Sequence, residues 1–190
     1  MKSRAFLIFL ILGGAVAVSR SAGALTEGIG KGDARACYLA AETHQYPEIG
    51  IATCSRALVE ESLNNADRAS TLVNRGVLKF ANGENAEAMA DFEAAIKILP
   101  EQGDAYADRG VSLILLGRYD EALANINQGI DLGLNHPYLG YYDRALAEEV
   151  MGRYPDAYRD YKHALELEPG FTQASDKLKT FILTKAPSPS

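Results

Sequence analysis

The feature that most constrains this chain is an internal repeat of 34 to 35 residues. The tetrapeptide Asn74-Arg75-Gly76-Val77 recurs at 108–111 as Asp-Arg-Gly-Val and at 143–146 as Asp-Arg-Ala-Leu. Four further anchor types keep this spacing: a turn glycine, a small residue, a bulky residue and a second small residue (Gly83, Gly117, Gly152; Ala88, Ala122, Ala157; Phe92, Ile126, Tyr161; Ala95, Gly129, Ala164). A period of this length indicates stacked structural units, each of which needs its neighbours to bury its apolar face.

Each copy has the pattern of two helices. The first stretch of each copy combines good helix formers with apolar residues at helical spacing and ends near a glycine (70–81, 104–115 and 139–150). A second apolar-periodic stretch follows a short polar turn (86–98, 120–132 and 155–167). The small residues allow two helix backbones to approach closely, while Phe92 fills the space toward the next pair. The sequence therefore predicts an all-α stack of helix pairs.

These copies resemble tetratricopeptide repeats. In the first copy the resemblance rests on the first-helix glycine, the turn glycine, the alanine–aromatic–alanine ladder and the closing proline (Gly76, Gly83, Ala88, Phe92, Ala95, Pro100). The copies differ from the family pattern in having arginine at 75, 109 and 144, where leucine is commoner, and in lacking tryptophan. The resemblance implies a right-handed solenoid of antiparallel helix pairs, with three clear repeats (69–102, 103–137 and 138–171).

A degenerate fourth copy is expected upstream, at residues 33–68. Ala36-Cys37-Tyr38 would lie on its first helix and residues 51–58 on its second, with residues 62–68 as the connection to the next pair. Downstream, residues 172–185 are predicted to form a capping helix. Its apolar side would be Ala174, Leu178, Phe181 and Ile182. Residues 186–190 are expected to be a disordered tail.

In the register of the repeats, Cys37 corresponds to Arg75, and Cys54 lies near the position of Asp91 and Phe92. Those positions should face each other across an antiparallel helix pair, so we expect a Cys37–Cys54 disulfide. Closing a loop of this size should stabilise a weak terminal repeat by about 3 kcal/mol. A redox-catalytic pair would need a closer spacing, such as C-x-x-C.

The N-terminal segment 1–24 has the three-part layout of a secretory signal. Lys2 and Arg4 precede an uncharged apolar run, and Ala22-Gly23-Ala24 offers the small residues of a cleavage site. We predict cleavage after Ala24 and no stable membrane insertion after it, with an uncleaved anchor as the alternative. Residues 25–32 would then be a flexible linker. The expected location is periplasmic or secreted, an oxidising environment in which a disulfide persists.

The charge of the chain limits the partners that it can bind. The formal net charge is −6, with 19 lysines and arginines against 25 acids. Binding to nucleic acid or to an anionic membrane surface depends on a surplus of basic residues, so neither is expected as the main partner. An unidentified protein or peptide is the predicted partner.

Patterns that could carry catalysis or metal binding are weak. His163-x-x-Glu166 could place two ligands on one helix face, but no third ligand recurs nearby. Gly28-Ile-Gly-Lys-Gly32 resembles a phosphate loop, yet no strand precedes it and no Ser or Thr follows the lysine. The adjacent acids at 60–61 and 148–149 diverge along a helix. We therefore expect no enzyme, no metal site and no cofactor.

The repeated arginines admit two interpretations. Arg75, Arg109 and Arg144 lie on first helices, and a polar partner recurs on the second helices at a constant spacing (Asp91, Asn125 and Asp160). The favoured interpretation is a structural contact repeated in each pair. The alternative is a row of cations that reaches the carboxylates of a ligand, which arginines paired inside the stack would exclude.

In a tetratricopeptide solenoid the concave groove is built from the first helices, which implies a set of groove residues here. The set is apolar in the middle with acids at its edge (Val73, Val77, Phe80, Asp104, Ala107, Val111, Ile114, Tyr142, Leu146, Glu149). Some family members bind a C-terminal carboxylate through lysine and asparagine on these helices, and apolar residues replace them here. We expect a non-catalytic interaction module that binds an apolar helix or extended peptide, with basic flanks as an option.

The alternative function is a structural protein of the cell envelope that self-associates through the ends of its stack. Five tyrosines crowd the last copy and could supply interface aromatics, although Tyr141 and Tyr154 fall at core-like positions (Tyr138, Tyr141, Tyr142, Tyr154, Tyr158). Size that depends on concentration would separate the two functions.

Overall fold

The computed structural model of the chain describes residues 32–44 and 46–185. Its helices are α2 (Asp33–Thr43), α3 (Pro47–Glu60), α4 (Asn65–Ala81), α5 (Asn85–Ile98), α6 (Gly103–Leu115), α7 (Tyr119–Leu132), α8 (Pro137–Val150), α9 (Tyr154–Leu167) and α10 (Thr172–Lys185). All regular structure within those two ranges is helical, which confirms the predicted all-α stack. The predicted signal segment, the linker before Gly32 and the tail lie outside the described residues.

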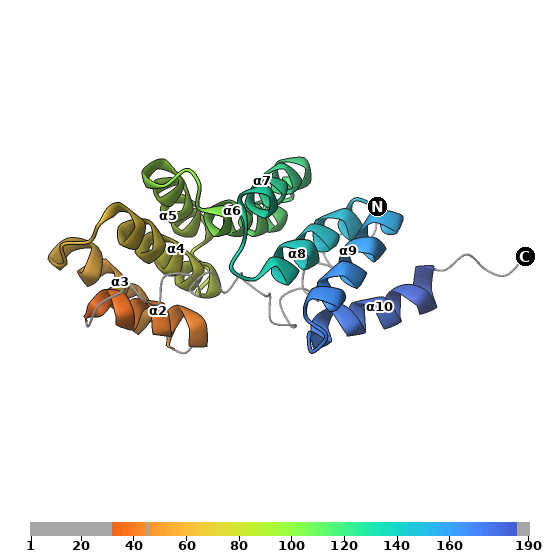
Figure 1. The fold of residues 1–190 in the computed structure, drawn as a ribbon, viewed down its shortest axis with the longest axis horizontal. Helices are drawn as coiled ribbons and strands as arrows, with labels where there is room; N and C mark the ends of the chain where they lie inside the picture. The colour runs from red at the N-terminus through yellow and green to blue at the C-terminus, as the bar shows by residue number, and fades with distance from the viewer. Residues whose placement is uncertain (1–31, 45, 186–190) are drawn as a thin grey trace, which may run out of the picture.

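The helices pack as consecutive pairs, α2 with α3, α4 with α5, α6 with α7 and α8 with α9. Each pair contacts the next one along the chain, and α10 packs on α9. Figure 1 shows an arc with α2 and α10 at its two ends and with α5 and α7 on its outer side. We call the side of α4, α6 and α8 that points away from their partner helices α5, α7 and α9 the inner face.

Two sets of small residues set the geometry of each pair. The turn glycines Gly83, Gly117 and Gly152 have φ angles of 83°, 72° and 78°, a left-handed conformation that residues with a Cβ rarely adopt. A Cβ added to Gly76 would lie 2.5 Å from the Phe92 ring. The first helix can therefore lie directly against the bulky residue of the second helix.

The start of α4 corrects the predicted connection at 62–68. The helix begins at Asn65, so most of that segment is helical. The cause is a cap that the repeat pattern does not reveal: Asn64 Oδ1 accepts a hydrogen bond from the backbone N–H of Asp67 at 2.8 Å, and Asn64 Nδ2 donates to the Asp67 carboxylate at 2.8 Å. These bonds satisfy donors at the helix N-terminus and fix where the helix starts.

The C-terminal helix α10 covers the last pair, as predicted. Ala174 is fully buried and Phe181 is nearly so, and both join the apolar cluster of Tyr142 and Tyr161 with Leu178 beside them. The outward side of α10 is polar (Thr172, Asp176, Lys179, Thr180). Of the helices in the described part of the chain, none is both long enough and apolar enough to cross a bilayer.

Candidate binding face

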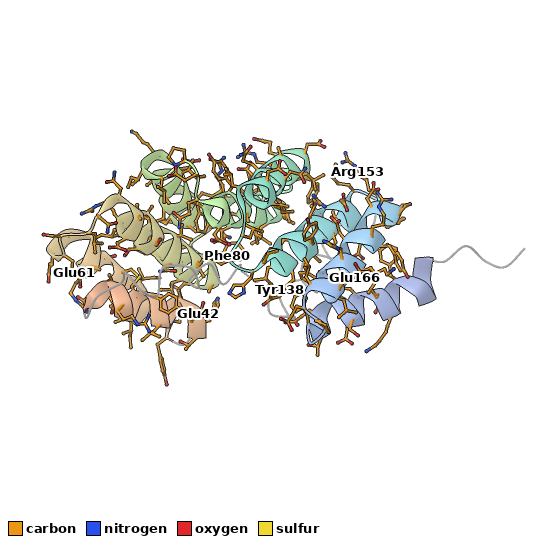
Figure 2. The ribbon with its side chains drawn as sticks, viewed as in Figure 1. Glu42, Glu61, Phe80, Tyr138, Arg153 and Glu166 are labelled. Atoms are coloured by element: carbon orange, nitrogen blue, oxygen red, sulfur yellow. A yellow bond between two sulfur atoms is a disulfide. The ribbon has the colours of Figure 1, made fainter. Side chains whose placement is uncertain are left out.

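The predicted groove residues lie on the first helices of the three clear repeats, and the structure packs them tightly. Nine of the ten are at most 8% exposed, and Glu149 is half-buried (Val73, Val77, Phe80, Asp104, Ala107, Val111, Ile114, Tyr142, Leu146, Glu149). Val73, Val77, Phe80 and Val111 share one apolar cluster, while Tyr142 and Leu146 belong to another. Figure 2 shows Phe80 of α4 and Tyr138 of α8 toward the hollow side of the arc.

Glu149 differs from the other predicted groove residues because it is bonded to α9 and α10. Its carboxylate accepts a hydrogen bond from the Tyr161 hydroxyl at 2.6 Å and forms an ion pair with Lys177 at 3.1 Å. Burial and the charge of Glu149 raise the pKa of Tyr161 above its usual range. This end of the predicted groove is therefore tied to the capping helix.

The inner face also carries a polar position that the sequence analysis used only as a repeat marker. The Gly76 side of α4 meets Phe92, and the Gly110 side of α6 meets Ile126. A residue two positions earlier lies about 200° around the helix and so points away from the second helix. These residues are Asn74, Asp108 and Asp143, which are 3%, 1% and 0% exposed. The signal was in the sequence, as a polar residue two positions before each close-contact position, an asparagine in the first copy and an aspartate in the next two.

Asp143 is buried without compensation. Among the residues that the structure describes, neither of its carboxylate oxygens has a hydrogen-bond partner. Complete burial raises the pKa of Asp143 well above its usual range, and the charge of Asp108 raises it further. An ionised carboxylate in such a place is costly, because neither water nor a donor stabilises its charge.

Asp104 adds a second buried acid one turn before Asp108. It accepts hydrogen bonds from the Asn135 backbone N–H at 3.2 Å and from the Asn135 side-chain amide at 2.6 Å. Burial raises the pKa of Asp104 to about 7, although the backbone hydrogen bond from Asn135 opposes that shift. The inner face around α6 is therefore acidic beneath its apolar surface.

The repeated arginines point to the second helices. Arg75 donates from Nε and Nη2 to the two oxygens of Asp91 at 2.8 and 2.7 Å. Arg144 donates in the same way to Asp160 at 2.5 and 2.9 Å. This bidentate geometry confirms the structural interpretation and shows that the alternative, a row of cations that binds a ligand, is wrong for these two residues.

The middle arginine has a neutral partner. Arg109 Nε donates to Asn125 Oδ1 at 2.7 Å, and Arg109 is in no ion pair within the described ranges. Arg75 also donates to Ser55 at 3.1 Å, and Arg144 donates to Asn127 at 2.7 Å, so these two arginines reach the preceding helix pair as well.

In the first pair, Cys37 and Cys54 are joined by a disulfide with an S–S distance of 2.11 Å and a Cα–Cα distance of 4.7 Å. Both cysteines are fully buried. The same pair is also held at the start of α2, where Glu61 accepts hydrogen bonds from the backbone N–H groups of Asp33 at 2.5 Å and Ala34 at 3.3 Å. The disulfide therefore fixes a pair that, among the described helices, has a neighbouring pair on one side only.

The tyrosines of the last copy divide into buried and exposed groups. Tyr142 is 7% exposed and packs on Tyr161 and Phe171, with ring centroids 5.5 and 5.0 Å apart. Tyr154 corrects its predicted core-like position, because it is 42% exposed. Its ring lies across the edge of Phe181, at 5.9 Å, so α10 leaves one side of it in solvent.

Metal chemistry finds no support in the described residues. They contain no group of three or more His, Cys, Asp or Glu side chains that could hold a metal ion. His163 Nδ1 and Glu166 lie 3.3 Å apart, but both side chains are about half exposed. That pair is a contact on the solvent side of α9.

Comparison with known families and structures gives one consistent result. A family model described as "Tetratricopeptide repeat" matches residues 69–102. Sperm-associated antigen 1 of Mus musculus is 30% identical over 139 residues, which are 68% of this chain and 15% of that protein. The Lipoprotein NlpI homolog of Haemophilus influenzae is 31% identical over 119 residues, 63% of this chain and 38% of that protein. The chain thus spans well under half the length of these relatives.

Solved structures share the fold. The first TPR of Spaghetti (RPAP3), bound to the HSP90 peptide SRMEEVD, has a TM-score of 0.60 at 22% identity and covers 64% of this chain and 98% of that chain. The second TPR domain of human RPAP3, in complex with the HSP70 peptide SGPTIEEVD, has a TM-score of 0.55 at 24% identity over 62% and 97% of the two chains. MamA 41-end from Desulfovibrio magneticus RS-1 has a TM-score of 0.61 at 17% identity over 83% and 88%.

Proposed function

Because the chain is a tetratricopeptide repeat protein, we propose that it is a non-catalytic interaction module that binds a peptide or helix of a partner protein on its inner face. The observation that carries the proposal is that the two sides of the first helices differ in their contacts. Arg75 and Arg144 hold each pair together from the side of the second helices. The opposite side of α4, α6 and α8 is not used by those bonds and is left for a partner.

The ligand should differ in charge from the peptides of the structural neighbours. The peptides SRMEEVD and SGPTIEEVD, named for two RPAP3 domains, are acidic at their C-terminal ends. Here the inner face carries the acids Asp104, Asp108 and Asp143, and the repeated arginines are engaged elsewhere. An acidic C-terminus would meet like charge, so the proposed ligand is an apolar segment with basic residues.

We place this module in the cell envelope. The N-terminal segment has the layout of a secretory signal, the Cys37–Cys54 disulfide suits an oxidising compartment, and one bacterial relative is named a lipoprotein homolog. Fractionation of the source cells, with the size of the mature chain read by mass spectrometry, tests this location. Recovery of the uncleaved chain in the cytosol would contradict it.

Selection of ligands from a library of displayed random peptides tests the binding proposal. The full chain, tagged at its C-terminus, is the bait. Two variants are compared: Val77→Thr/Val111→Thr, which places two hydroxyls among the buried apolar side chains of the inner face, and Val59→Thr, the same chemical change at a side chain that is 84% exposed on α3. Selected peptides should bind the wild type and Val59→Thr alike and should bind the inner-face variant roughly tenfold more weakly. Equal binding to all three proteins would show that the inner face is not the site.

Self-association is the second candidate, and a specific observation favours it. Three large apolar side chains at the turn between α2 and α3 are exposed: Leu39 at 47%, Tyr46 at 71% and Ile49 at 66%. Sedimentation over a wide range of concentrations measures this directly. A mass that rises with concentration in the wild type, but stays at that of a single chain in Tyr46→Ser/Ile49→Ser, would establish association through this end.

A further inference from the structure

The buried Asp143 of α8 is the feature that packing does not explain. Asp143 has an exposed fraction of zero and, across 32–44 and 46–185, no hydrogen-bond partner for either oxygen. Asp108 holds the equivalent position on α6 and is 1% exposed, and its charge acts on Asp143. The helices α6 and α8 are in contact. Two buried carboxylates at this range repel each other when both are ionised.

The fold does not require an acid at this position. The first copy has Asn74 there, 3% exposed, so a neutral side chain of nearly the same shape fits the site. The attachment of α8 to α9 is provided by the neighbouring Arg144 through Asp160. Asp143 therefore lowers the stability of the fold and makes no structural contact in exchange. This is typical of a residue that serves binding.

We propose that Asp108 and Asp143 together bind an arginine side chain of the partner peptide, inserted between α6 and α8 from the inner face. This assignment rests on the proposed function, because it gives the inner face its ligand chemistry. A guanidinium carries donors on two edges, so it can bond to a carboxylate on each helix. It is also more weakly hydrated than an ammonium group and therefore costs less to bury.

The surroundings of the pair favour an organic cation. A metal ion would need several ligands, and the described residues offer no cluster of three or more. Arg144 cannot neutralise the pair, since its guanidinium is engaged by Asp160 and Asn127. The apolar neighbours Val111 and Tyr142, 4% and 7% exposed, exclude water and strengthen an ion pair formed beside them.

The test uses the peptides selected on the wild-type chain, acetylated at the N-terminus and amidated at the C-terminus so that only side chains carry charge. Their affinities are measured by fluorescence anisotropy for the full chain and for Asp143→Asn. We expect the peptides to share an arginine whose replacement by citrulline weakens binding roughly tenfold or more. Asp143→Asn should weaken binding to a similar extent, and the two changes together should cost no more than either one.

Two controls separate binding from folding and from net charge. Asp143→Asn removes a buried acid that has no hydrogen-bond partner and keeps nearly the same shape, so its melting temperature should equal or exceed that of the wild type. Asp131→Asn makes the same change of charge at an exposed position of α7 and should leave the affinity unchanged. Replacing the peptide arginine by lysine should give a smaller loss than citrulline does.

The outcomes distinguish the two proposals. If peptides bind on the inner face but tolerate citrulline, or bind Asp143→Asn as well as the wild type, the arginine assignment is overturned and the proposed function stands. If the library yields no peptide that binds the wild type, the proposed function fails, and the arginine assignment fails with it.

Discussion

In the first helix pair a disulfide joins the two helices where an arginine and a carboxylate join them in the second and fourth pairs. In the register expected from the repeats, Cys37 corresponds to Arg75, and Cys54 lies beside the position of Asp91. In the third pair the same place holds the neutral contact between Arg109 and Asn125. The two helices of a pair are thus joined by a covalent bond, an ion pair or a single hydrogen bond.

The covalent bond is in the pair at the end of the described stack. The second and third pairs both lie between two others, and one has an ion pair while the other has a neutral contact. Within the described residues, the α2/α3 pair packs mainly against α4 and has small apolar clusters of its own. A short stack end with little buried apolar surface gains most from a covalent cross-link, which restricts its unfolded state.

The largest expected effect comes from removing the disulfide. Cys37→Ala/Cys54→Ala should lower the free energy of unfolding of the first pair by about 3 kcal/mol, because the cross-link closes a loop across 17 residues of sequence separation. Hydrogen exchange should show faster opening in α2 and α3, with α6 to α9 little changed. A reducing agent should lower the melting temperature of the wild type alone. Equal shifts in both proteins would contradict the role of the disulfide.

Breaking an ionic link should cost less. Arg144→Met keeps the length of the side chain but leaves the buried Asp160 carboxylate without its partner, so we expect a loss of about 2 kcal/mol in chemical denaturation. Asp160→Asn in the same chain should recover part of this loss, since no charge is then left unpaired. A double variant that is no better than the single one would show that Arg144 acts through packing alone.

The stability of the third and fourth helix pairs should depend on pH in the opposite direction to that of the first pair. Burial raises the pKa of Asp104 to about 7 and raises that of Asp143 as well, so both groups hold protons in the folded protein that they lose when it unfolds. This contribution is full below pH 4, near the unfolded pKa, and is lost as the pH rises through the folded pKa. From pH 5 to pH 8 we expect the free energy of unfolding to fall by roughly 3 kcal/mol or more, measured by thermal melting.

A matched variant and the first pair serve as references for that slope. Asp143→Asn should reduce the dependence of the free energy of unfolding on pH, because an asparagine does not titrate. In the first pair, the hydrogen bond to Arg56 lowers the pKa of Asp33, so protonation at acid pH weakens that contact instead. A slope that is identical in wild type and Asp143→Asn would remove Asp143 as its source.

The smallest expected effect is a gain. Asn125→Asp would give Arg109 the carboxylate that the other two arginines have, and partly exposed ion pairs of this kind contribute about 0.5–1 kcal/mol. Urea denaturation at low and high salt should show the gain and its reduction by screening. No gain at low salt would mean that the third pair is already limited by its neighbours.

The sequence predicted the helix pairs well because their anchors are forced by close contact. Gly76 must be small where Phe92 touches it, and such constraints repeat visibly. The start of α4 depends on one local cap, Asn64, which has no counterpart in the other copies and so left no periodic trace. A stretch that reads as a connection can thus be helical when a single side chain satisfies its first N–H groups.

The candidate site was predicted less completely. The periodicity of a sequence indicates the side of a helix on which a residue lies, but not how deeply its side chain is buried. It identified the helix side of Val77 and Val111 but could not show that both are almost fully buried. Asp143 was visible as part of a repeated tetrapeptide, yet its lack of a hydrogen-bond partner depends on what surrounds it in space. Tyr154 was misjudged for the same reason, because the position of α10 decides how much of its ring is covered.

The capping helix α10 also affects the symmetry with which copies of the chain can assemble. Its polar outer side closes one end of the stack, while the exposed Leu39, Tyr46 and Ile49 are at the other end. Copies that meet through the α2/α3 end each offer it once. Contacts between two such ends pair like with like around a two-fold axis and close at two chains.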